Sequence, residues 1–215
     1  MGENWSVSEL LFRFEEDIIT PKLVIDNNDN LHIALIMQKE KYSRVYYLNY
    51  TASNSTKTLV PVFTTSSSVF SCLRIGISHN DTLNIAWLSK KGSILEGTRD
   101  CMIQLQRRNI TTNEWLYEPL ALYNESNPNI IDISANYNSL HICWTNSSDF
   151  SNTQTISHIF LNESTKIWST YESLKLSSDY VKVLKIKHAN DEGLHVLWAI
   201  GATYSALYYL KWFTN

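Results

Sequence analysis

The feature that most constrains the fold of this chain is a five-residue segment that occurs four times. Each copy reads Leu, then His or Asn, then Ile or Val, then a small or aliphatic residue, and then Trp in three of the four cases. The copies are Leu31–Leu35, Leu83–Trp87, Leu140–Trp144 and Leu194–Trp198. Their first residues are 52, 57 and 54 positions apart. A repeat of about 50 residues predicts a fold that uses one supersecondary unit several times.

Each copy is flanked by further strand signals. An alternating apolar stretch and a polar turn precede it, which predicts strand, tight turn, strand. These leading segments are Lys22–Asn30, Leu73–Thr82, Asn129–Ser139 and Val183–Gly193. A third strand is predicted over Arg44–Asn49, Met102–Arg107, Thr155–Leu161 and Ala206–Phe213. A fourth is predicted over Thr58–Phe63, Trp115–Tyr123 and Trp168–Leu176.

The last repeat has no fourth strand of its own. The N-terminal segment Asn4–Leu11 reads like the fourth strands that begin at Trp115 and Trp168. An unpaired strand edge favours pairing with a matching strand. We therefore expect Asn4–Leu11 to complete the sheet formed by Val183–Phe213.

Four antiparallel strands in a repeat of about 50 residues resemble a β-propeller blade. The pattern Leu-His-Ile-x-Trp after a turn rich in Asn, Asp or Gly is similar to the blades of sialidase-like bacterial propellers. The chain lacks the Ser-x-Asp-x-Gly-x-Thr-Trp box of sialidase blades and the Gly-His and Trp-Asp signatures of WD40 repeats. The resemblance therefore concerns the architecture alone and gives no basis for assigning an activity to this chain.

The predicted fold is all-β: a single β-propeller domain over residues 1–215 with four four-stranded antiparallel blades. Its repeats span about 20–63, 70–123, 128–176, and 180–215 together with 4–11. A β-sandwich of short strands is the competing fold, but a sandwich has no reason to repeat at this period. A four-bladed monomer is slightly favoured over a strand-exchanged dimer with eight blades, because closure within one chain avoids the entropy cost of association. Excision from a longer protein is a third alternative.

Composition excludes several classes of protein. The 18 basic and 21 acidic residues leave a net charge of −3, which argues against a nucleic-acid partner. No apolar run approaches the roughly 20 residues that a membrane span needs, and no signal peptide opens the sequence. The three cysteines include no Cys-x-x-Cys pair, so neither a zinc site nor a redox motif is predicted. Free cysteines favour a cytoplasmic location, although the sequence does not fix the compartment.

Charged residues on the innermost strands are the strongest candidates for a functional site in the sequence. Arg74, Asp132 and Lys185 stand among apolar neighbours in the first strands of three repeats. Inner strands line the channel of a propeller, so we predict these three residues as ligand-binding candidates. Arg74 and Asp132 could instead neutralise each other.

The remaining candidate residues are better explained by structural roles than by catalysis or metal binding. His32, His141 and His195 occupy one repeat position in different blades, too far apart to share a metal ion, and we expect each to bond to the turn before it. No nucleophile, metal or cofactor motif is visible. The sequence thus predicts a non-catalytic binding or scaffold module with a glycan or protein ligand. The alternative is a glycosidase-like or sialidase-like hydrolase that uses carboxylates at the central channel.

Overall fold

The fold consists of strands joined by turns and loops. The computed structural model describes residues 8–39, 42–66, 68–78, 81–91, 100–116, 120–123, 127–136, 138–147, 154–176, 181–189, 193–201 and 205–213. All regular structure in these ranges is β-strand, which confirms the prediction of an all-β protein. None of the described residues forms a helix long and apolar enough to cross a membrane.

The strands form four antiparallel sheets in chain order. The first sheet contains β1 (Asp17–Ile25), β2 (Leu31–Lys39), β3 (Tyr42–Thr51) and β4 (Thr56–Thr65). The second contains β5 (Ser68–Ser78), β6 (Thr82–Lys91), β7 (Asp100–Asn109), β8 (Glu114–Trp115) and β9 (Leu120–Tyr123). The third contains β10 (Asn127–Ala135), β11 (Ser139–Ser147), β12 (Gln154–Asn162), β13 (Ile167–Trp168) and β14 (Glu172–Lys175). The fourth contains β15 (Val181–His188), β16 (Gly193–Gly201) and β17 (Ser205–Phe213).

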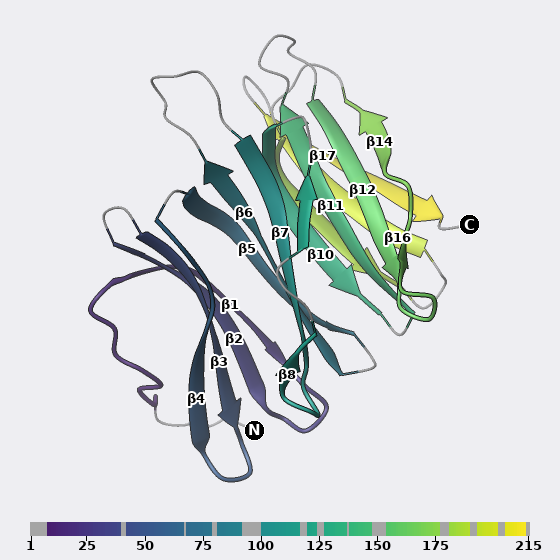
Figure 1. The fold of residues 1–215 in the computed structure, drawn as a ribbon. Helices are drawn as coiled ribbons and strands as arrows, with labels where there is room; N and C mark the ends of the chain where they lie inside the picture. The colour runs from purple at the N-terminus through teal and green to yellow at the C-terminus, as the bar shows by residue number, and fades with distance from the viewer. Residues whose placement is uncertain are drawn as a thin grey trace, which may run out of the picture.

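The sheets stand side by side in a propeller-like row (Figure 1). Their first strands are neighbours, because β1 contacts β5, β5 contacts β10, and β10 contacts β15. The first and fourth sheets lie at opposite ends of the row in Figure 1. Among the described residues, no hydrogen-bonded ladder joins these two sheets. The row therefore brings the four inner strands together without showing a closed ring.

The predicted N-terminal seam is not seen. Residues 4–7 lie outside the described residues, and the part that is described lies beside the first sheet. Lys57 in β4 pairs with the Glu9 carboxylate at 2.5 Å and donates to the carbonyl oxygen of Leu10 at 3.1 Å. Within the described part of the chain, the fourth sheet consists of three strands. Two outer strands also differ from prediction, since Trp115–Tyr123 and Trp168–Leu176 are each split into two short strands.

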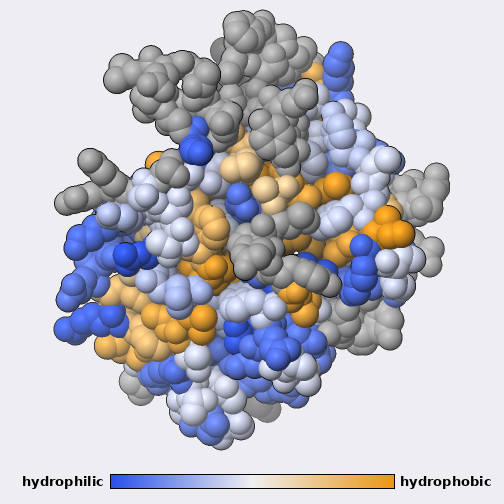
Figure 2. Space-filling view, viewed as in Figure 1, coloured by the Kyte–Doolittle hydropathy of each residue, from blue (hydrophilic) through white to orange (hydrophobic). Residues whose placement is uncertain are grey.

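The core lies between the sheets, and the repeated segment builds much of it. Each interface buries the Leu, the Ile or Val and the Trp of one sheet against the sheet before it. The residues are Leu83, Ile85 and Trp87 at the first interface, Leu140, Ile142 and Trp144 at the second, and Leu194, Val196 and Trp198 at the third. Other apolar residues stay exposed, and Figure 2 shows hydrophobic patches among hydrophilic surface on one face of the molecule. The shared packing rule explains why one sequence pattern recurs in three sheets.

We expect replacement of Trp87 by Ala to lower the free energy of unfolding by about 3–5 kcal/mol. The indole is fully buried against Phe63 and Phe70, and its Nε1 has no hydrogen-bond partner among the described residues, so its contribution is almost wholly apolar. Ile167→Ala is the matched control, because Ile167 is 66% exposed on an outer strand. Urea denaturation measures both variants. Equal losses would contradict the assigned core.

Candidate functional site

The three predicted site residues occupy equivalent places on neighbouring inner strands. Arg74 in β5 pairs with Ala86, Asp132 in β10 pairs with Cys143, and Lys185 in β15 pairs with Leu197. The partners Ala86, Cys143 and Leu197 hold one repeat position, the fourth residue of the repeated segment. In the first sheet Lys22 of β1 pairs with the equivalent Ala34. We call Lys22, Arg74, Asp132 and Lys185 the inner row.

The structure brings Arg74, Asp132 and Lys185 together around one carboxylate. Arg74 donates from Nε to Asp132 Oδ1 at 2.6 Å, and the Lys185 ammonium lies 3.6 Å from the same oxygen. The other oxygen, Oδ2, accepts the backbone N–H of Ile186 at 3.0 Å. Asp132 is therefore an acceptor for the sheets on both sides of it, and it ties three inner strands together.

Exposure separates the roles of the inner-row residues. The Asp132 side chain is 8% exposed and the Arg74 side chain 18%, whereas the Lys185 side chain is 56% exposed. Lys22 is exposed as well. Arg74 is further oriented by an N–H bond from Nη1 to the Leu73 carbonyl. The geometry gives an oriented guanidinium in a row that also carries two lysine side chains exposed to solvent.

The inner strands are basic although the whole chain is acidic. Strands β1, β5, β10 and β15 carry five basic side chains, Lys22, Arg74, Lys182, Lys185 and Lys187, and two acidic ones, Asp17 and Asp132. The net charge of the chain is −3. Positive charge is thus concentrated on these strands, and such concentration attracts anions.

A second repeated polar arrangement escaped the sequence analysis. His32 bonds through Nδ1 to the Tyr47 hydroxyl at 2.6 Å, and His195 bonds through Nδ1 to the Tyr209 hydroxyl at 2.7 Å. In the third sheet the Nδ1 of His141 lies 3.0 Å from the Nε2 of His158. The repeat alignment would have revealed these pairs, because the partner always stands opposite the fourth residue of the repeated segment.

At the first interface this pair is covered by the second sheet. The Arg108 guanidinium lies 5.2 Å from the Tyr47 ring centroid and 4.8 Å from that of Trp115. Burial raises the pKa of Tyr47 to about 12 even though Arg108 favours its ionised form.

The turn before His32 is held by the Asp26 carboxylate. It accepts hydrogen bonds from the backbone N–H groups of Asn28 and Asn30, and it pairs with the His32 ring at 3.1 Å. Burial opposes ionisation of Asp26, but these hydrogen bonds lower its pKa overall. His32 thus holds its turn as predicted.

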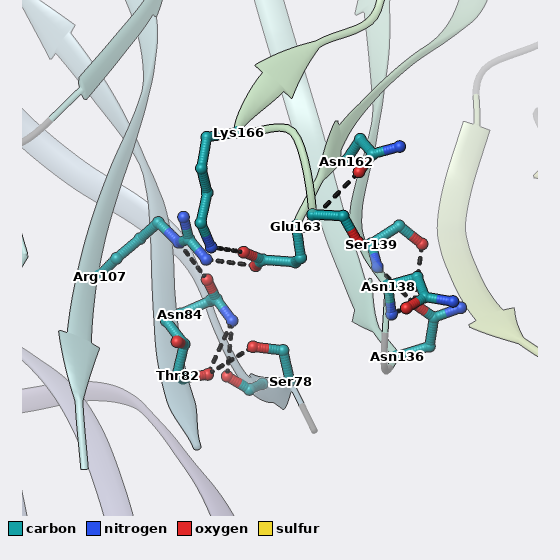
Figure 3. A network of polar contacts seen from close by, with 12 residues as sticks. Ser78, Thr82, Asn84, Arg107, Asn136, Asn138, Ser139, Asn162, Glu163 and Lys166 are labelled. Atoms are coloured by element: carbon teal, nitrogen blue, oxygen red, sulfur yellow. Dashed lines mark hydrogen bonds and ion pairs between the residues drawn. The ribbon is translucent and has the colours of Figure 1, made fainter. Parts of the chain in front are cut away.

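At the second interface the pairing is ionic (Figure 3). Asn84, which replaces the histidine, accepts from Arg107 Nε at 2.9 Å, and Arg107 pairs with the buried carboxylate of Glu163 in the third sheet. Lys166 contacts the other Glu163 oxygen at 2.8 Å. Burial would raise the pKa of Glu163, but hydrogen bonds and charge from Arg107 and Lys166 lower it. This network links the second and third sheets.

The third interface contains stacked imidazoles. His141 and His158 are almost fully buried, with ring centroids 5.3 Å apart, and the His188 ring lies 5.0 Å from that of His141. Burial, with smaller effects from His158 and His188, lowers the pKa of His141 to about 3. Burial likewise lowers the pKa of His158 to about 4. Among the described residues no group of His, Cys, Asp or Glu is arranged to hold a metal ion.

The cysteines offer no reactive thiol at these interfaces. Cys143 is completely buried, and burial together with the charge of Asp132 raises the pKa of its thiol well above the ordinary value. Cys72 donates from Sγ to the carbonyl oxygen of Asn129 at 3.2 Å. Both side chains therefore serve packing between sheets, and the inner row remains the site with accessible charge.

Comparisons with known proteins place the fold. No family model matches the chain, and no curated protein matches its sequence. A PL25 ulvan lyase, described as a new family of polysaccharide lyase, matches 93% of this chain with a TM-score of 0.60 and 11% identity. Its second structure is bound to -[GlcA(1-4)Rha3S]-. A Hadza microbial sialidase matches 88% of this chain with a TM-score of 0.57 and 9% identity. The chain spans 53% of the lyase and 43% of the sialidase.

These matches correct one prediction. The sequence predicted a module without a catalytic centre, but the ulvan lyase and the sialidase, two solved structures that share its fold, are carbohydrate-active enzymes. The prediction was wrong because it treated a missing local motif as evidence against catalysis. In a row of sheets, a site is assembled from single residues on different strands, and such a site leaves no contiguous motif in the sequence.

We expect the protein to lose stability as the pH falls from about 6.5 toward 4. In the folded protein the pKa values of His141 and His158 lie below the ordinary 6.5, so both rings stay neutral while those of the unfolded chain bind protons. Each histidine then removes up to about 1.4 kcal/mol of unfolding free energy per pH unit. Urea denaturation at several pH values measures this slope.

The variant His158→Tyr copies the arrangement of Tyr47 and removes one of the two titrating rings. Its loss of stability between pH 6.5 and 4 should be smaller than that of the wild type. His195→Gln is the control, because His195 is the second-strand histidine of the fourth sheet and is only half-buried. An unchanged acid slope in His158→Tyr would contradict the assignment.

Proposed function

We propose that this chain belongs to a carbohydrate-active enzyme that binds and cleaves an acidic polysaccharide along the inner strands. Its four sheets are the blades of one propeller domain over residues 1–215, and the inner row faces the axis. Lys22, Arg74 and Lys185 contact acid groups of the substrate, and Asp132 positions Arg74. The observation that carries the proposal is the concentration of basic side chains on β1, β5, β10 and β15 in a chain of net negative charge.

The chemistry of the inner row suits carboxylate and sulfate groups. A guanidinium is planar and can pair with a carboxylate through two parallel hydrogen bonds, whereas a lysine ammonium acts as a point charge. Asp132 holds Arg74 in place through Nε, and the exposed Lys185 is free to turn toward a ligand. The fold neighbour with a bound oligosaccharide supports this class of substrate, since GlcA and Rha3S carry a carboxylate and a sulfate.

Elimination at a uronic acid is the reaction that the inner row favours. In this reaction a base takes the proton from the carbon next to the sugar carboxylate, a carbon–carbon double bond forms, and the glycosidic oxygen leaves and takes up a proton. A cation beside the carboxylate stabilises the negative charge that develops. Hydrolysis by paired carboxylates instead requires two acidic groups facing each other. Asp17 and Asp132 are the acidic residues of the inner strands, and Asp132 already accepts hydrogen bonds from Arg74 and from the backbone N–H of Ile186.

Hydrolysis is the second candidate, and the likeness to a sialidase fold supports it. The two reactions give different products. Elimination leaves an unsaturated sugar that absorbs ultraviolet light, whereas hydrolysis releases reducing ends without that absorbance. Incubation with polyuronates, sulfated polysaccharides, sialylated glycans and neutral glucans therefore identifies both the substrate class and the reaction.

We expect Lys185→Gln to weaken binding of the cleaved acidic polysaccharide by about tenfold, the value of one charge-assisted hydrogen bond. Its removal leaves the Arg74–Asp132 pair in place, so folding should not change. Lys175→Gln is the matched control, an exposed lysine on the outer strand β14. Titration calorimetry at low and high salt measures the affinities. Equal binding of neutral and acidic polysaccharides, or equal losses in both variants, would contradict the proposal.

A further inference from the structure

Each of the first three sheets buries one face against the next sheet, and the corresponding face of the fourth sheet is exposed. In the first three sheets, two residues of the second strand and two of the third pack against the next sheet. These are Ala34, Ile36, Val45 and Tyr47, then Ala86, Leu88, Ile103 and Leu105, then Cys143, Thr145, Ile156 and His158. All twelve are at most 2% exposed.

The equivalent residues of the fourth sheet are Leu197, Ala199, Leu207 and Tyr209. Leu207 is 68% exposed, Tyr209 59% and Leu197 37%. We call these four residues the closing face. They are as apolar as their counterparts, so this face retains the composition of a sheet interface although no described residue covers it.

The first sheet carries part of the opposite half of the same interface, while its Leu35, the counterpart of the three Trp residues, is already buried. Leu23 in β1 corresponds to Ile133 and Ile186, which pack against the preceding sheet and are 9% and 7% exposed. Leu23 itself and Ile25 are each 61% exposed. We call Leu23 and Ile25 the leading face.

We propose that the closing face of one copy of this chain packs against the leading face of a second copy. The contact repeats the three interfaces already present within the chain. Because the two faces are different surfaces, the contact is heterologous, and two such contacts related by a twofold axis would close a ring. This inference concerns assembly and does not depend on the proposed function.

Two observations favour a second copy as the occupant. The chain spans 53% of the ulvan lyase with which it shares its fold, so two copies supply about the length of one such protein. The polar residues at the proposed contact also correspond to those at the first interface within the chain. Tyr47 at the first interface meets Arg108 and Trp115, which pair across β7 and β8.

Tyr209 is the counterpart of Tyr47 on the closing face, and it makes the same bond to a second-strand histidine. The first sheet carries Tyr50 and Lys57, paired across β3 and β4, where the second sheet carries Arg108 and Trp115. A second copy would therefore again offer Tyr209 one aromatic ring and one cation. In the single copy, Glu9 holds that cation at the edge of the sheet.

Sedimentation analysis of the whole protein tests the proposal. We expect a mass of twice 24.8 kDa for the wild type at micromolar concentration. Leu207→Lys on the closing face and Leu23→Lys on the leading face should each give monomers. Ile167→Lys is the matched control, because the three side chains are 68%, 61% and 66% exposed and only Ile167 lies outside both faces. It should remain a dimer.

A mixture of the two monomeric variants distinguishes the mode of contact. The intact closing face of Leu23→Lys can bind the intact leading face of Leu207→Lys, so the mixture should regain a dimer through one undamaged contact. A monomeric wild type would overturn the proposal, as would an open chain of more than two copies. A dimer that survives Leu23→Lys would also overturn it, since it would show closing faces packed on each other.

Discussion

The apolar contact between the Trp-bearing face of one sheet and the preceding sheet holds the rest of the structure in place. Trp87, Trp144 and Trp198 sit at the same position of three sheets, and an aromatic side chain buries about 150–250 Å² in such a contact. The contact fixes the spacing of the sheets and therefore sets β1, β5, β10 and β15 side by side. The charges of the inner row approach one another only because this packing is repeated without change.

Polar residues then distinguish one interface from the next. The first contains a histidine, a tyrosine and an arginine, the second contains Arg107 with Glu163, and the third contains stacked histidines. A buried charge or imidazole placed against the wrong neighbour would lose its partner, which is costly. These pairs therefore favour the observed order of sheets.

The repeat predicted most of the fold and the inner row, because strand periodicity and alignment of the repeats depend on local sequence. It placed Arg74, Asp132 and Lys185 on inner strands, and in the structure Arg74 and Lys185 both contact the Asp132 carboxylate. The Arg107–Glu163 pair could not be predicted, since it links residues 56 positions apart whose charges look solvent-exposed in sequence. The N-terminal strand was predicted from likeness alone, whereas Glu9 contacts the first sheet. The likeness to folds of carbohydrate-active enzymes was missed, because the sites on such folds are built from scattered residues that leave no contiguous motif.

The central claim is that acidic carbohydrate binds along the inner strands. Hydrogen–deuterium exchange of the whole protein, with and without a short acidic oligosaccharide that it binds, tests this claim most directly. The account predicts slower exchange in β5, β10 and β15, around Arg74, Asp132 and Lys185, with β4 and β14 unchanged. Protection confined to the outer strands β4 or β14, with the inner strands unaffected, would contradict it.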